Sequence, residues 1–302
     1  SFARNHYWYD TTRGANKQIL SNATDAEATI TGRLSAFDTG GFTVGSSSEV
    51  NNSGETYVAW ALKANGGTTS SNTDGTVTST VQANTDAGFS IIKYVGNGVI
   101  NQSIGHGLDS TPELYITKNL DTGGTGWFTK TTVIDGSLDE LALNTTDAAS
   151  NVSNTNLPTS SVIYQYNNTN LGANGQNYIV YAFHSVDSFS KIGTYTGNGS
   201  TNGTIVETGF EPAFIMIKQT DDVANWCIVD NKRSTTNPRN KTLRANSDVS
   251  EATVGSTQLV VDFLSNGFQL KQTSGNNVNN GNFLYMAFAA DPDTEAPTLA
   301  SS

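Results

Sequence analysis

Residues 94–98 read YVGNG, and almost the same stretch returns at residues 195–199 as YTGNG, roughly a hundred residues later. The match continues beyond this turn, because residues 112–118 (PELYITK) correspond to residues 212–218 (PAFIMIK). A period of this length is too long for one rung of a solenoid and is about the size of one small domain. The sequence therefore predicts a tandem array of repeated domains.

The array begins part-way through a repeat. The segment YIVYAF at residues 178–183 closes one repeat, and a similar segment, YVAWAL, already occurs at residues 57–62 without a Gly-Asn-Gly turn before it. The motifs that open at Asn22 (NATDAE), Asn144 (NTTDAA) and Asn246 (NSDVSE) mark three copies of the second half of the repeat. We therefore expect a strand at residues 57–62, and we expect the sequence to be a piece of a longer protein.

These repeats define the expected domain organisation. We predict the C-terminal half of a β-sandwich repeat at residues 1–64, a linker with one extra strand (residues 76–81) at 65–87, complete β-sandwich repeats at 88–186 and 187–290, and an exit segment or linker at 291–302.

The composition favours short strands joined by turns. Charged residues make up 14% of the chain, and Gly, Asn, Thr and Ser crowd the segments between apolar runs, whereas helices favour Ala, Leu, Glu and Lys. Regular apolar alternation and 36% hydrophobic content argue against disorder. With roughly six or seven short strands in each repeat, we predict an all-β fold of tandem, jelly-roll-like β-sandwich domains, the first of them truncated.

The charge balance disfavours nucleic acid as a partner. Sixteen basic and 27 acidic residues give a net charge of −11, and the densest basic cluster fits a solvated loop better than a phosphate track. No apolar run is long enough to span a bilayer, so we expect no membrane insertion. The single cysteine, Cys227, lies in an apolar strand pattern and is expected to be a buried, unreactive thiol. The basic cluster consists of Lys232, Arg233, Arg239, Lys241 and Arg244.

Several longer motifs accompany the repeat. They are GETYVAWALK at 54–63, NTDGTVTS at 72–79, GFSIIKYVGNG at 88–98, IGHGL at 104–108, LNTTDAA at 143–149, FSKIGTYTGNG at 189–199 and TGFEPAFIMIK at 208–218. In this order they resemble the repeats, roughly a hundred residues long, of tail-fibre and other virion surface proteins from phages, particularly marine and cyanobacterial phages. The resemblance covers nearly the whole chain.

This resemblance implies a structural protein of the phage virion, outside the cell, in a tail fibre or surface appendage whose modules serve assembly and attachment to a host surface. It implies other virion proteins or further copies of this chain as partners, in a homo-oligomer, and a host-surface glycan as a ligand. Two alternatives stay open. One is a secreted bacterial adhesin or carbohydrate-binding array, and the other is a capsid decoration or spacer protein that binds no receptor.

The sequence shows no constellation typical of catalysis or metal binding. His6, His106 and His184 lie at non-equivalent places without metal-ligand spacing, so we expect no metal and no cofactor. The aspartates at 221–222 and at 291 and 293 could supply calcium ligands, but solvated turns explain them better. No pair of carboxylates suits a glycosidase, which makes a surface-glycan hydrolase the weakest hypothesis. We expect the protein not to be an enzyme.

One strand differs between the repeats in a way that suggests a binding site. Residues 162–166 read VIYQY, and alignment on the following turn places Ile163 in the core. Tyr164 and Tyr166 then lie on the solvent side, beside the Asn-rich loop 167–174, where they could stack on and hydrogen-bond a sugar. The alternative is a slipped register in which both tyrosines and the valine before them face the core.

Overall fold

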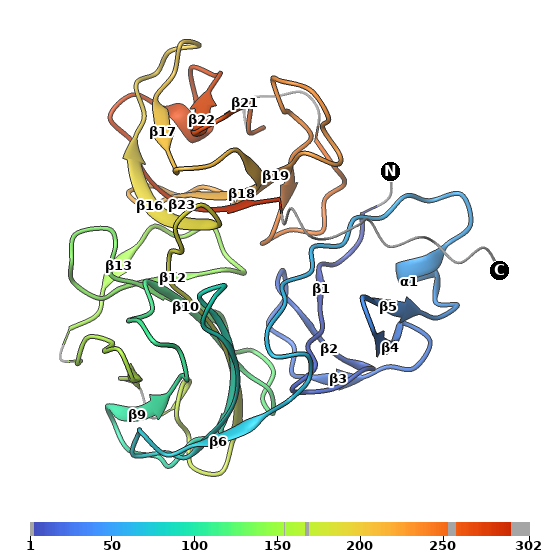
Figure 1. Cartoon of the computed structure of the whole chain (residues 1–302), viewed down its shortest axis with the longest axis vertical. Coiled ribbons are helices and arrows are strands. Elements are labelled where there is room, and N and C mark those ends of the chain that lie inside the picture. The colour runs from blue at the N-terminus through green and yellow to red at the C-terminus, as the bar shows by residue number, and fades with distance from the viewer. Residues whose placement is uncertain (1–2, 154, 167–168, 253–257, 291–302) are drawn as a thin grey trace.

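The computed structural model describes residues 3–153, 155–166, 169–252 and 258–290 of the chain. It is built almost wholly of antiparallel strands, with one α-helix of four residues, α1 (Ser48–Asn51), and one short 3-10 helix, η1 (Gly275–Asn277), in those ranges. The predicted all-β fold is confirmed. Three lobes lie around a common centre (Figure 1), and we call them unit one (residues 3–64), unit two (65–186) and unit three (187–290).

Unit two is a sandwich of a large and a small antiparallel sheet. The large sheet has the order β13-β12-β11-β10-β15-β8-β7-β6, and the small sheet pairs β14 with β9. Ile92, Ile104, Ile163 and Val180, all inaccessible to solvent, pack in its core. The strands are β6 (Ser70–Asn72), β7 (Ser79–Asn84), β8 (Phe89–Val95), β9 (Gln102–Gly105), β10 (Leu114–Asn119), β11 (Trp127–Thr131), β12 (Asp139–Ala142), β13 (Ser150–Asn151), β14 (Val162–Gln165) and β15 (Asn177–Phe183).

Unit three repeats this plan. Its large sheet has the order β16-β23-β18-β19-β20 and its small sheet the order β17-β22-β21. Ile215, Val229, Phe268 and Phe283, again fully buried, belong to its core. The strands are β16 (Ser190–Thr196), β17 (Ile205–Glu207), β18 (Pro212–Gln219), β19 (Cys227–Asp230), β20 (Leu243–Arg244), β21 (Val261–Leu264), β22 (Gly267–Leu270) and β23 (Asn282–Ala289).

Unit one contains only the second half of this plan. It has a small sheet of the order β1-β2-β3 and a hairpin of β4 and β5. Ile19 and Leu34 are its most deeply buried apolar side chains. The strands are β1 (Tyr7–Trp8), β2 (Lys17–Leu20), β3 (Ala28–Thr29), β4 (Leu34–Asp38) and β5 (Gly41–Val44).

The Gly-Asn-Gly turns need glycine for two physical reasons. Gly98 and Gly199 adopt φ angles of +76° and +63°, a region that glycine enters at little cost. Gly96 and Gly197 lie so close to the backbone of the facing loop that a Cβ atom there would collide with it. The repeated motif is therefore explained by the turn itself.

The three units close into a ring through equivalent contacts. The residue two positions after each repeated asparagine offers its backbone carbonyl to a backbone N–H of another unit. Unit two bonds to unit one, unit three to unit two, and unit one to unit three, so the arrangement approximates threefold symmetry. The three bonds run from Gly124 to Thr24 (3.0 Å), from Ala224 to Thr146 (2.9 Å) and from Arg4 to Asp248 (3.0 Å).

A shared apolar core lies where the units meet. Trp127 of unit two is fully buried, and its Nε1 donates to the carbonyls of Leu20 (2.8 Å) and Ala23 (3.1 Å) in unit one. Trp226 of unit three donates in the same way to Ala142 of unit two (3.0 Å). All six residues of strand β10 are buried, so the strand is covered on both faces.

Residues 57–62 do not form a strand, contrary to the expectation from the sequence. The matching strand of unit two, β15, is paired with β8 on one side and β10 on the other. The described part of unit one contains no counterpart of either, so the segment has no strand to pair with. Trp60 and Leu62 consequently remain 37% and 45% exposed, whereas their counterparts Tyr181 and Phe183 are each 4% exposed.

The linker region contributes more strand than the sequence pattern indicated. Residues 65–87 were expected to be a linker with one extra strand at 76–81. They contain two strands instead, β6 at Ser70–Asn72 and β7 at Ser79–Asn84. Both strands extend the large sheet of unit two, and the Ser79 hydroxyl donates to the carbonyl of Gly105 (2.7 Å).

Candidate functional site

The two tyrosines singled out from the sequence lie at the end of β14. Ile163 and Gln165 are fully buried, while Tyr164 and Tyr166 are only partly buried. Ile163 and Gln165 therefore face the core and the slipped register is not observed. The ring of Tyr166 nevertheless packs inward, with its centroid 5.2 Å from Nζ of the buried Lys130. Of the neighbouring loop, residues 167 and 168 lie outside the described part of the chain.

The hydroxyl of Tyr166 is already used inside unit two. It donates to Glu140, whose two carboxylate oxygens each lie 2.9 Å away. Burial and then the neighbouring carboxylate raise the pKa of Tyr166 well above its usual range. A sugar bound at this strand would therefore meet Tyr166 through its ring rather than through its hydroxyl.

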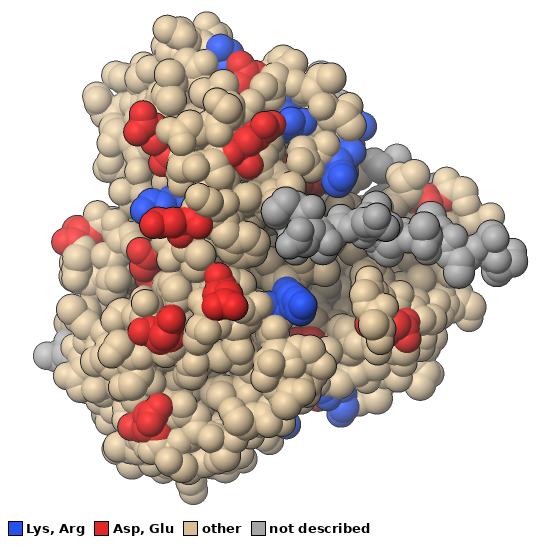
Figure 2. Space-filling model, viewed as in Figure 1, with Lys and Arg blue, Asp and Glu red and all other residues tan. Residues whose placement is uncertain are grey.

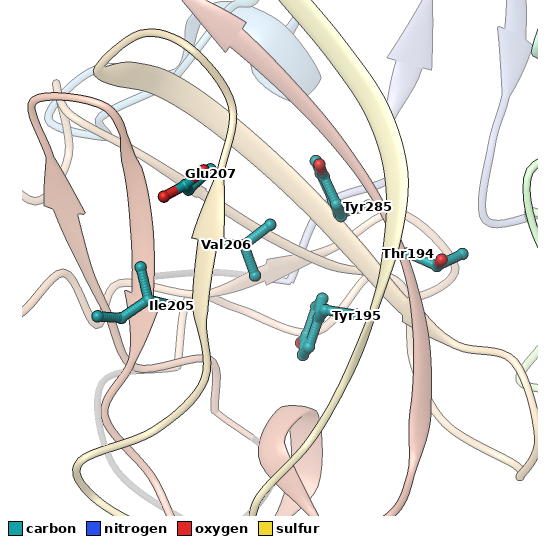
Figure 3. A pocket seen from close by; sticks show the side chains of 6 residues that line it. All are labelled: Thr194, Tyr195, Ile205, Val206, Glu207 and Tyr285. Atoms are coloured by element: carbon teal, nitrogen blue, oxygen red, sulfur yellow. The ribbon is translucent and has the colours of Figure 1, made fainter.

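A pocket of about 520 Å³ opens between β16 and β17 of unit three (Figure 3). In unit two the same place is filled, because β7 pairs with β8 and Val77 bridges to Ile104, the counterpart of Val206. Among its described residues, unit three has no such strand, so β16 is the edge of its sheet. An extended segment of another chain could add to this edge. The pocket is lined by Thr194, Tyr195, Ile205, Val206, Glu207 and Tyr285.

A second pocket, of about 530 Å³, lies between units two and three and contains a buried acid. Asp139 is 2% exposed, and its Oδ2 has no hydrogen-bond partner among the described residues. Burial, followed by repulsion from Asp135, raises the pKa of Asp139 to about 6. Asp221 in the same wall accepts from the backbone N–H of Asn282 (2.9 Å) and so holds the start of β23.

Of the other candidates from the sequence, His106 is a buried, hydrogen-bonded residue of the fold, and two aspartates lie outside the described part of the chain. His106 is fully buried, and burial lowers its pKa. Its Nδ1 accepts a hydrogen bond from the backbone N–H of Leu108 (3.1 Å), and its Nε2 lies 3.1 Å from the carbonyl oxygen of Thr159. Residues 291 and 293 lie outside the described part of the chain. Within that part, no group of three or more His, Cys, Asp or Glu is placed to hold a metal ion.

Arg233, one member of the basic cluster of unit three, is engaged in internal ion pairs. Arg233 lies 2.6 Å from Asp230 and 2.9 Å from Glu251. On the face shown in Figure 2, acidic side chains are scattered over the surface and the basic ones form no continuous track.

This ion-pair network is a repeated feature that the sequence patterns missed. In unit one, Arg13 pairs with Asp10 and Glu27 just as Arg233 does in unit three. In both units the aspartate of this network also accepts a hydrogen bond from the segment that closes another repeat, residues 178–183 or 57–62. The two bonds run from the Tyr181 hydroxyl to Asp10 (2.7 Å) and from Trp60 Nε1 to Asp230 (3.2 Å). The sequence signal for this network is an Asp followed three residues later by an Arg, at residues 10–13 (DTTR) and 230–233 (DNKR).

Comparison with known proteins gives one match. A family model described as a Domain of unknown function (DUF7483) matches residues 1–292. No curated protein matches the chain, and no solved structure does. In the described ranges, no helix has the length and apolar character needed to cross a membrane.

Proposed function

The chain belongs to the DUF7483 family, and we propose that it is a structural protein of a phage virion, in a tail fibre or another surface appendage. In this proposal the modules assemble with further copies or with other virion proteins and attach the particle to a host-surface glycan. The virion location rests on the likeness of the repeat motifs to those of phage tail-fibre proteins.

Exposed apolar side chains on strand β5 of unit one support the assembly part of the proposal. Phe42 and Val44 on β5 are 43% and 37% exposed, but their counterparts on β22 of unit three, Phe268 and Leu270, are fully buried. In the described residues β5 pairs with β4 along one edge only. Exposed apolar side chains on such an edge strand suit assembly, because a strand from a neighbouring segment can pair with the free edge and bury them.

Immunogold electron microscopy with antibodies against this chain tests the location. We expect gold on the tail or surface appendages of phage particles released by a culture that carries the gene. A secreted bacterial adhesin is the second candidate, since the partly exposed Tyr164 would serve glycan binding there equally well. Gold on the envelope of uninfected cells would support the adhesin and reject the virion protein.

Changing Tyr164 and Tyr166 together to alanine should weaken binding of the oligomeric protein to host cells by about tenfold, because two aromatic contacts are lost.

Binding of the unmodified protein should change little between low and moderate salt, since an acidic chain must bind an anionic glycan through neutral contacts. Flow cytometry with labelled protein measures both effects.

Tyr166→Phe is the matched control for this pair. It keeps the ring and removes only the bond to Glu140, so host-cell binding should be unchanged. A double-alanine variant that folds and binds normally would disprove the tyrosine site. If no version binds any host surface, the protein is a spacer or capsid decoration.

A further inference from the structure

Lys130 on β11 is a charged side chain in the middle of unit two. Its side chain has no exposed surface, and its Nζ donates to Oε1 of Gln165 at 3.0 Å. A carboxylate oxygen of Glu140 lies 3.7 Å from the same nitrogen. Three rings surround it, with centroids 5.5, 5.9 and 5.2 Å from Nζ. They belong to Tyr115, Phe128 and Tyr166.

The fold itself does not require this polar cluster. In unit two Lys130 lies opposite Tyr115 in the sheet, and in unit three the counterpart pair is Val229 and Ile215. The counterpart of Gln165 is Leu270, and all three apolar counterparts are fully buried. Burying an ammonium group is costly, and an apolar core at the same positions demonstrably folds. Folding alone therefore does not explain why unit two has polar residues at these positions.

The amide of Gln165 is held in one orientation. Its Nε2 donates to the hydroxyl of Thr117 at 3.0 Å, while its Oε1 accepts from Lys130. In unit three the counterpart of this threonine is the apolar Ile217. The amine is thus fixed beside the carbonyl oxygen, and the threonine hydroxyl fixes the amide nitrogen.

We propose that Lys130 and Gln165 react with each other to form an isopeptide bond inside unit two, with Glu140 as the group that moves the proton.

The reaction balances without any co-reactant. The unprotonated Nζ attacks Cδ of Gln165, so a C–N bond forms and the carbonyl oxygen takes up negative charge. Glu140 accepts a proton from the attacking nitrogen and delivers it to Nε2. The bond between Cδ and Nε2 then breaks, ammonia leaves, and the carbonyl is restored as a secondary amide.

The surroundings favour the first step. Burial lowers the pKa of Lys130 to about 8, which increases the fraction of free amine near neutral pH. The surrounding rings exclude water, so hydrolysis of the amide does not compete. Two reacting groups held in contact also gain the large rate advantage of an intramolecular reaction.

The product would tie together the two sheets of unit two, because β11 belongs to the large sheet and β14 to the small one. A covalent link between them prevents the sandwich from opening and restricts the unfolded chain over the 35 residues that it spans. Such a link would resist mechanical load and proteolysis whatever particle or surface displays the protein.

Intact mass spectrometry of the purified, denatured chain tests the proposal. We expect a mass lower than the sequence mass by one ammonia molecule, and a fragment in which the peptides of Lys130 and Gln165 are joined. Lys130→Met should restore the full mass. Lys93→Met, which changes a partly exposed lysine of the same sheet, should keep the loss and serves as the matched control.

Glu140→Gln tests the proton-transfer role. The folded variant should form the link at least about tenfold more slowly than the unmodified chain, as measured by mass at timed intervals after refolding. Full sequence mass in the folded, unmodified protein after prolonged incubation at pH 8 would overturn the proposal. So would an ammonia loss that persists in Lys130→Met, since it would then come from another amide.

Discussion

Replacing Trp127 with alanine should lower the free energy of unfolding by about 3–5 kcal/mol, because it empties a fully buried site at the centre of the ring. The indole donates to two carbonyls of unit one and packs edge-on against Trp8 of that unit, with ring centroids 5.2 Å apart. The variant therefore loses contacts between units as well as apolar volume. Urea unfolding followed by circular dichroism gives the change if the slope m is unaltered.

Trp60→Ala is the control for this variant. Trp60 also joins two units, through its bond to Asp230, but it is 37% exposed and lies in a segment without a strand partner. Its removal should cost less than half as much, because less surface returns to water. Equal losses in the two variants would contradict a core centred on Trp127.

Asp10→Ala should produce the second large loss, about 3–5 kcal/mol, because it leaves a buried guanidinium without its nearest carboxylate. The side chains of Asp10 and Arg13 are 3% and 1% exposed, and their Oδ2 and Nε atoms lie 2.5 Å apart. The carboxylate also accepts from the Tyr181 hydroxyl of unit two, so that bond is lost as well. Chemical unfolding again measures the effect.

Two further variants show whether the buried charge is the cause. Asp10→Ala combined with Arg13→Met should recover much of the stability, because no unpaired charge then remains inside. Asp38→Ala, at an exposed carboxylate that accepts from the Thr43 hydroxyl (2.6 Å), should change stability by no more than about 0.5 kcal/mol. A double variant no more stable than Asp10→Ala would contradict the explanation.

The repeat could be predicted from sequence because local chemistry produces it. The aligned asparagines Asn22, Asn144 and Asn246 all accept a hydrogen bond from a backbone N–H with the same side-chain oxygen, at 3.0, 2.8 and 2.9 Å. A turn or side-chain bond of this kind needs a particular residue, so it leaves a repeated letter in the sequence.

The closure of the ring could not be predicted in the same way. Its backbone bonds are accepted by carbonyl groups, which every residue carries, so Thr24, Thr146 and Asp248 need not be alike. The strand expected at residues 57–62 was wrong for a related reason. An apolar run becomes a strand only where other strands pair with it, and pairing is a property of the assembled sheet.

The polar cluster around Lys130 was also beyond the sequence. The lysine and Gln165 are 35 residues apart and meet only when the two sheets face each other. The available sign was the lysine at a position where the third repeat has Val229, but one charged residue in a strand usually marks its solvent face.

Three interlocked repeats should unfold together. Differential scanning calorimetry of the whole chain measures this directly, because Trp127 and Trp226 each bond to a second unit and the central core belongs to all three. We expect one transition in which the calorimetric and van't Hoff enthalpies agree. Separate transitions, or a van't Hoff enthalpy of only about a third of the calorimetric value, would show independent domains and contradict the ring.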